Sequence, residues 1–243
     1  MQDLANYKDL ARRYGFAATP ESVSRLTQLV ARQDSDLDEI ARAIDKDPAL
    51  RARLLRVANP DADNEAEYTV ETAEQALMRN GLGCALLLAM GTPLALALTK
   101  TFQTMLSLKL ENVDPHVIEP LNCMHLLGMI GFSGQALGRV YLRMSEDSAR
   151  HVAAGILGLD ATELTEQGEV TDAIGELLNI MTGNFKSNLC DAGLDCRLQT
   201  PEVKRTDDLC TPTVPGGGLE RMAFRAPKIV LFVDVTVNPW NDD

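Results

Sequence analysis

Apolar residues in the first part of the chain recur at the spacing of helices. Within residues 21–33 and 48–58, leucine, valine and alanine return every three or four positions, which places them on one side of a helix. Pro48 is expected at the start of a helix, because the N–H that proline lacks has no hydrogen-bond partner within the helix at that position. Residues 34–47 predict a further helix with Ser35 as its N-cap. The pattern predicts an all-helical region over about the first ninety residues.

Two more helices are predicted before the pattern changes. Residues 69–83 predict a helix that ends near Asn80 and Gly81, because glycine suits the left-handed conformation that closes many helices. Residues 93–107 predict a separate helix. The run 84–98 is strongly apolar, but glycine, threonine and proline break it, and it is shorter than the roughly 20 residues of a membrane span. We interpret this run as part of a core.

Strands enter the pattern in the second half of the chain. The predicted elements are a hairpin over 124–144 that turns at 133–135, a helix capped by Ser145, a helix over about 170–189, and strands within 195–205 and 225–239. A Pro/Gly-rich loop is predicted over 210–220. The order predicts an α+β fold of two regions, 1–90 and 91–243.

Charge and cysteine content restrict the partners and the location. The formal net charge of −12 argues against a nucleic-acid partner, because phosphate backbones are bound by clustered lysine and arginine. The five cysteines are scattered without a CxxC pair, and the N-terminal stretch lacks the order of a signal peptide. They predict reduced thiols in a cytoplasmic protein. The three histidines have no metal-ligand spacing, so no metal site is expected.

Residues 170–185 separate into two opposite faces when they are placed on a helix of 100° per residue. One face is apolar and comprises Val170, Ile174, Leu177, Leu178, Met181 and Phe185. The other face carries Asp172, Glu176, Asn179 and Gly183, which we call the polar stripe. A glycine inside a helix costs about 1 kcal/mol relative to alanine, but it lets a second backbone approach closely. The polar stripe is therefore predicted to dock against a partner.

The residue types of the polar stripe limit its chemistry. The Asn179 carboxamide can hold a water molecule, and the Glu176 carboxylate can accept a proton or pair with a cation. The stripe has no serine, cysteine or histidine, which excludes the usual acyl-transfer chemistry. What remains is positioning a water for attack on a reactive electrophile, or an ordinary solvated face. A second Glu-x-x-Asn pair, Glu119 and Asn122, contains a proline and is interpreted as a chance occurrence.

Two segments carry a family resemblance, IGFSGQALGRVYLRMSEDSARHVAAGILG and EVTDAIGELLNIMTGNFKSNL. They resemble the CheX-like branch of the CheC/CheX/FliY phosphatases, which act on the phosphorylated chemotaxis response regulator. The resemblance covers roughly residues 92–243 and includes the Glu-x-x-Asn pair followed by Gly183 and Asn184. The CheC branch carries two such helices, whereas this chain, like CheX, carries one. The resemblance implies long helices packed on a mostly antiparallel sheet.

This resemblance implies a phosphatase for the phosphoaspartate of a CheY-like receiver domain in two-component signalling. It implies that Asn179 orients the attacking water and that Glu176 fixes the complex by pairing with the receiver's active-site lysine. Asp172 and Gly183 are then docking positions. The receiver supplies the Mg²⁺, so no cofactor of its own is expected. The alternative is a catalytically silent adaptor that docks on a receiver domain or another signalling partner.

The resemblance also implies a homodimer with sheets joined across the subunits. The last predicted strand, residues 228–237, is long and strongly β-forming, and as a bare edge it would invite aggregation. A partner subunit, or alternatively the N-terminal helices, is expected to cover that edge.

The N-terminal region resembles the front of an HDOD domain, a helical relative of the HD phosphohydrolases. The resemblance rests on SDLDEIARAIDKDPALRARLLRVAN and YTVETAEQALMRNGLG and covers about residues 15–90. HDOD domains lack a complete HD metal site, and this region has no histidine, so no catalysis is expected there. Two interpretations stay open: a helical cap on the second region, and a partner-binding module.

Overall fold

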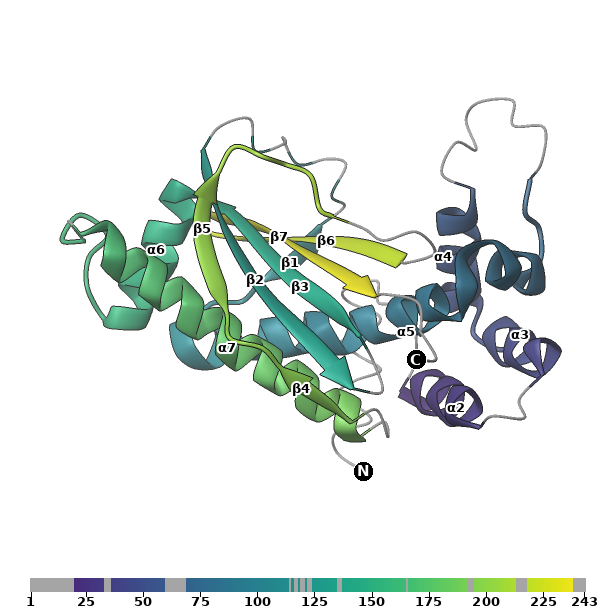
Figure 1. The fold of residues 1–243 in the computed structure, drawn as a ribbon. Helices are drawn as coiled ribbons and strands as arrows, with labels where there is room; N and C mark the ends of the chain where they lie inside the picture. Colours follow the sequence, from purple (N-terminus) through teal and green to yellow (C-terminus); the bar gives the residue numbers. More distant parts are fainter. Residues whose placement is uncertain are drawn as a thin grey trace.

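The computed structural model describes residues 20–32, 36–59, 69–113, 115, 118, 121, 124–134, 137–164, 166–191, 195–212 and 218–237. Helices α2 (Pro20–Ala31), α3 (Leu37–Asp45), α4 (Pro48–Ala58) and α5 (Ala73–Leu106) come first. An antiparallel sheet follows, with α6 (Glu146–Leu157) and α7 (Gln167–Asp191) packed on it (Figure 1). The predicted α+β fold is confirmed.

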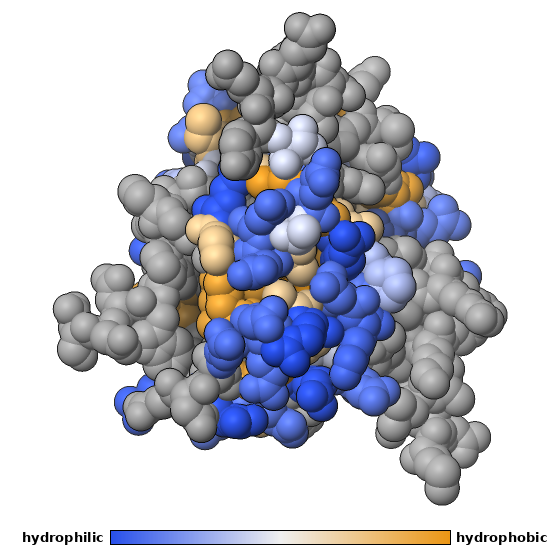
Figure 2. Space-filling view, turned by 90° about the vertical axis from the view of Figure 1, so that its right-hand side faces the viewer, coloured by the Kyte–Doolittle hydropathy of each residue, from blue (hydrophilic) through white to orange (hydrophobic). Residues whose placement is uncertain are grey.

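The N-terminal helices form where their caps and apolar spacing place them. Pro48 opens α4 as predicted. The N-cap of α3 is Asp36, whose side chain accepts a hydrogen bond from the Asp38 N–H, so the cap lies one residue after the predicted Ser35, which is outside the described residues. Leu50 and Leu54 are fully buried, and α2, α3 and α4 all pack on α5. Figure 2 shows this end of the molecule, where hydrophilic side chains gather over apolar ones.

Helix α5 is one continuous element of 34 residues, roughly 50 Å long at 1.5 Å per residue. It begins with a capping box, in which the Thr72 side chain accepts from the Gln75 N–H and the Gln75 side chain accepts from the Thr72 N–H. The predicted end near residues 80–81 is therefore wrong, and the helix predicted over 93–107 is its continuation.

Burial explains why α5 continues through glycine and proline. In an isolated helix these residues cost about 1 and 3 kcal/mol, whereas each fully buried leucine stabilises by about 1.5–3 kcal/mol. The buried residues along this stretch are Ala85, Leu88, Ala89, Leu94, Ala95, Ala97 and Leu98. The predicted boundary near residue 90 lies inside this helix, and the division into two regions stays a prediction.

The sheet contains seven strands, β1 (Glu111–Val113), β2 (His125–Gly134), β3 (Gly138–Ser145), β4 (Cys196–Leu198), β5 (Glu202–Thr206), β6 (Gly218–Ala226) and β7 (Ile229–Val237). Their order is β1-β6-β7-β3-β2-β4, with β5 also paired to β2, and every described pairing is antiparallel. The predicted β2–β3 hairpin is confirmed.

Two predictions about the strands are wrong. Strand β7 lies between β6 and β3, so it is not an edge of the sheet. Among the described strands, the edges are β1 on one side and the short β4 and β5 on the other. Strand β6 begins at Gly218, inside the segment predicted as a loop. Its pairing with β7 stabilises an extended conformation there, although glycine has no strand preference of its own.

One face of the sheet is covered by helices. Helices α5 and α6 pack on β7, α7 packs on β2, β4 and β5, and α7 also contacts both other helices (Figure 1). Ser145 caps α6 as predicted, by accepting from the Ser148 N–H at 3.1 Å. The rings of Phe132 in β2 and Phe185 in α7 meet edge to face, with centroids 5.9 Å apart. The main core therefore lies between the sheet and these helices.

The other face of the sheet carries a buried polar cluster around Asp234. Asp234 is fully buried, and Arg221 donates to its two carboxylate oxygens, each at 2.7 Å. These hydrogen bonds raise the pKa of Arg221 above its ordinary value. Arg143 places its Nε 3.6 Å from the same carboxylate, and the Thr211 hydroxyl also donates to it.

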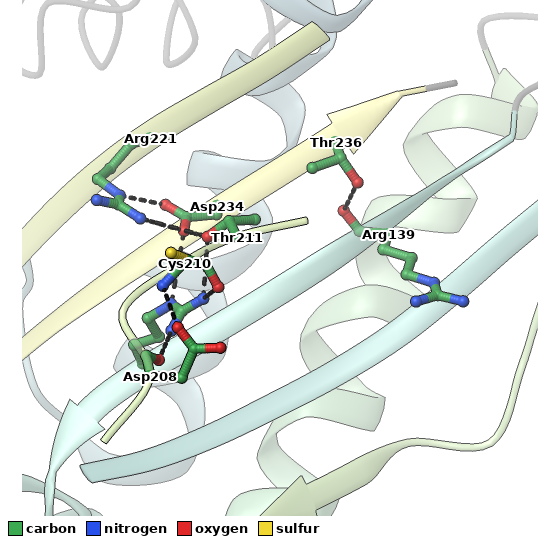
Figure 3. Close-up of polar contacts among 8 residues, drawn as sticks. Arg139, Asp208, Cys210, Thr211, Arg221, Asp234 and Thr236 are labelled. Carbon is green, nitrogen blue, oxygen red and sulfur yellow. Dashed lines mark hydrogen bonds and ion pairs between the residues drawn. The ribbon is translucent and has the colours of Figure 1, made fainter. Parts of the chain in front are cut away.

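Figure 3 shows Arg221 and Thr211 pointing toward the Asp234 carboxylate. Arg143 joins the segment after β5 to this cluster. Its guanidinium donates to the carbonyl oxygens of Asp208 and Cys210 at 3.0 and 2.8 Å, and to the Thr211 hydroxyl at 3.0 Å. The strands thus differ on their two faces: the face toward the helices is apolar, whereas the face toward this segment buries charged side chains beside Tyr141 and Phe232.

We expect Asp234→Ala to lower the free energy of unfolding by about 3–5 kcal/mol, because it leaves the Arg143 guanidinium buried without a carboxylate. Urea denaturation followed by circular dichroism measures this. Asp207→Ala, at an exposed position of the same segment, is the control and should change stability little. Equal stability of the two variants would show that the cluster does not hold this face together.

Candidate functional site

The apolar face predicted for residues 170–185 is confirmed in α7. Val170 is 6% exposed, and Ile174, Leu177, Leu178, Met181 and Phe185 are fully buried. Because this face takes up the contacts with α5, α6 and the sheet, the opposite face of the helix is turned away from the core.

The polar stripe lies on that opposite face. Asp172, Glu176 and Asn179 are exposed, and Gly183 is half-buried. The side chains of Glu176 and Asn179 make no hydrogen bond or ion pair with the described residues. Helices α2, α3 and α4 pack on one another and on α5, and the two side chains remain exposed with those helices in place. The carboxylate and the carboxamide are therefore available to a partner and to water.

Within the described structure, packing does not require a glycine at position 183. A Cβ atom built at this position meets no atom within 4 Å. At Gly175, two turns earlier, a Cβ atom would lie 3.7 Å from Val203 Cγ2, in ordinary contact. The bare backbone at Gly183 therefore opens to the surroundings, as a close approach by another chain requires.

Asn184, which follows the stripe, points elsewhere. It is half-buried, and its Nδ2 donates to the Thr101 hydroxyl of α5 at 3.2 Å. Sequence patterns did not mark Thr101, because one threonine in an apolar helix carries no local signal. The second Glu-x-x-Asn pair, Glu119 and Asn122, lies outside the described residues.

The polar stripe carries two carboxylates, a carboxamide and a glycine, and no serine, cysteine or histidine. The described residues include no group of three or more histidine, cysteine or acidic side chains arranged to hold a metal ion. In the same part of the chain, no helix has the length and apolar character to cross a bilayer. What α7 offers is an exposed carboxamide, an exposed carboxylate one turn away and an open backbone.

Two family profiles match the chain. Residues 126–215 match the chemotaxis phosphatase CheX, and residues 16–113 match the HDOD domain. Both resemblances inferred from the sequence are confirmed, and the HDOD match reaches past residue 90 to the end of β1. No curated protein sequence matches this chain.

Solved structures share the fold of the second region. CheX from Desulfovibrio desulfuricans is 19% identical with a TM-score of 0.53, over 61% of this chain and 99% of that chain. CheX from Vibrio vulnificus is 25% identical with a TM-score of 0.52, over 61% and 96%. A CheC-like superfamily protein from Shewanella sp. PV-4 is 24% identical with a TM-score of 0.53, over 61% and 97%. Nearly the whole of each protein is matched, so the rest of this chain lies outside the shared fold.

Proposed function

We propose that this chain, in which a CheX domain follows an HDOD domain, accelerates hydrolysis of the phosphoaspartate of a CheY-like receiver domain in the cytoplasm. The observation that carries the proposal is the exposed stripe of α7, with Glu176, Asn179 and Gly183 on one face of a helix whose other face is buried. The CheX match covers this helix.

Asn179 is proposed to orient the attacking water. Its carboxamide oxygen accepts a hydrogen bond from the water, which aims an oxygen lone pair at the phosphorus. The P–O bond to the aspartyl oxygen breaks as the new one forms, the aspartate leaves as a carboxylate, and the water proton passes to the phosphate product. A positioned water removes the entropic cost of finding the attack geometry, so no nucleophile or base on the stripe is required.

The two carboxylates of the stripe require cations on the partner. Asp172 and Glu176 approach an anionic phosphoryl group, and like charges repel unless cations lie between them. A lysine of the receiver that pairs with Glu176, and Mg²⁺ held by the receiver, would supply those cations. Glu176 thereby contributes to the orientation of the complex, and this chain requires no cofactor of its own.

A catalytically silent adaptor is the alternative function. It would use the same stripe to bind a receiver domain without accelerating phosphate loss. Binding of the phosphorylated receiver together with an unchanged hydrolysis rate would identify the adaptor and exclude the phosphatase.

We expect Asn179→Ala to keep stability within about 0.5 kcal/mol, because the side chain is exposed. Turnover should fall by about 100-fold or more, because the water loses its orientation. Glu176→Ala should also lose activity, with a larger share of the loss in receiver binding. The measurement is the rate of phosphate loss from a phosphorylated receiver domain at several receiver concentrations.

Asn122→Ala, in the second Glu-x-x-Asn pair, is the matched control and should retain the parent rate per folded molecule. If Asn179→Ala dephosphorylates a receiver as fast as the parent does, the water-positioning role is wrong.

We expect Gly183→Leu to weaken receiver binding by bulk alone. Gly183→Ala is the matched control: its Cβ enters open space, and stability should rise by up to about 1 kcal/mol because alanine favours the helix. Isothermal titration with a receiver domain held in its phosphorylated form measures the affinity of each variant. Unchanged binding by Gly183→Leu would place the docking surface elsewhere.

We expect a homodimer, on the basis of the CheX resemblance, and its sheet contact would use β1 or the β4–β5 edge because β7 is internal. Light scattering at micromolar concentration should then give about twice the chain mass of 26.5 kDa. A mass of one chain at that concentration would contradict the dimer.

A further inference from the structure

A directed polar contact joins α7 to α5. Asn184 Nδ2 donates to Thr101 Oγ1 at 3.2 Å, and Thr101 is fully buried. The Thr101 hydroxyl in turn donates to the Ala97 carbonyl oxygen at 2.8 Å. Because the hydroxyl proton is used in that bond, the Thr101 oxygen faces Asn184 as an acceptor. The polarity of the contact is therefore fixed.

The rest of the α7 interface is largely apolar and does not fix the helix in the same way. Leu177, Leu178, Met181 and Phe185 are fully buried, and the hydrophobic effect that buries them has no preferred direction. A hydrogen bond weakens steeply when its angle changes. A rotation of α7 by about 20° about its own axis would carry a side-chain atom 5–6 Å from that axis through about 2 Å.

Asn184 and Asn179 are rigidly related through the helix that carries both. Five residues separate them, which corresponds to about 140° around the axis and about 7.5 Å along it. Asn179 consequently faces outward while Asn184 reaches α5. Holding Asn184 in place therefore sets the direction in which the Asn179 carboxamide points.

We propose that Asn184 is a positioning residue: by donating to Thr101, it fixes the rotation of α7 against α5 and so aims Asn179 at the reacting water. This inference rests on the proposed phosphatase function for its effect on rate. Thr101 belongs to α5, the helix on which α2, α3 and α4 pack. The helix that orients α7 is therefore also the helix that supports the N-terminal region.

The test compares two variants that remove the bond with one that keeps it. In Asn184→Ala and Thr101→Val, kcat for dephosphorylation of a receiver domain should fall by about 10- to 100-fold, since a misplacement of about 1 Å can cost 100-fold. KM for the receiver should rise as well, because Glu176 lies on the same helix and turns with it. Thr101→Ser keeps the hydroxyl and should retain the parent kcat. The double variant Asn184→Ala/Thr101→Val should be no slower than either single variant.

Thr99→Val is the matched control on the same helix. The Thr99 hydroxyl donates to the Ala95 carbonyl oxygen at 2.7 Å, as Thr101 does to Ala97. The Thr99 side chain is half-buried and makes no hydrogen bond to the described side chains of α7. Its kcat should equal that of the parent. An unchanged kcat in Asn184→Ala, beside an inactive Asn179→Ala, would overturn the proposal. A Thr101→Ser variant as slow as Thr101→Val would overturn it too.

A second readout separates this inference from the proposed function. Residual dipolar couplings of backbone amides report the orientation of α7 relative to α5 in the full chain, whether or not the protein hydrolyses anything. They should change in Asn184→Ala and Thr101→Val, and stay at parent values in Thr101→Ser. If the parent protein dephosphorylates no receiver but these couplings shift, the phosphatase function fails while the alignment by Asn184 stands. Couplings that do not shift would overturn the alignment itself.

Discussion

The burial of one face of α7 is the constraint on which the candidate site depends. Five side chains of that face, Ile174, Leu177, Leu178, Met181 and Phe185, are fully buried, and each stabilises the packed helix by about 1.5–3 kcal/mol. A helix buried along one side presents its opposite side to solvent. Glu176 and Asn179 therefore project from a helix, which places side chains more precisely than a loop does.

Helix α5 belongs to the HDOD match and packs directly on the CheX-like part of the chain. The HDOD match includes the whole of α5, and the same helix packs on α7, β6 and β7 of the CheX-like fold. A flexible linker between two domains would allow them to move independently. In this chain α2, α3 and α4 instead pack on the same continuous helix that carries Thr101 and contacts α7.

The sequence alone determined the parts of the fold that local rules govern. The two faces of α7 follow from 100° per residue, the β2–β3 hairpin from apolar runs around a glycine, and the start of α6 from the Ser145 cap. The exposed positions of Glu176 and Asn179 follow from the same periodicity. Their identification as a functional pair did not: the spacing by itself favoured a solvated face, and only the resemblance to the CheX-like phosphatases favoured chemistry.

Tertiary structure alone decided the features in which distant segments compete with local preference. Gly81 predicts a helix end, because a glycine inside a helix costs about 1 kcal/mol relative to alanine. Burial of side chains along α5 outweighs that cost, and this burial depends on distant segments that a short stretch of sequence does not contain. The internal place of β7 follows from its pairing with both β6 and β3, and β3 lies about ninety residues earlier in the chain. The partnership of Asn184 with Thr101 has the same origin. Hydrogen bonds between side chains so far apart in the sequence exist only because the core has already brought their helices together.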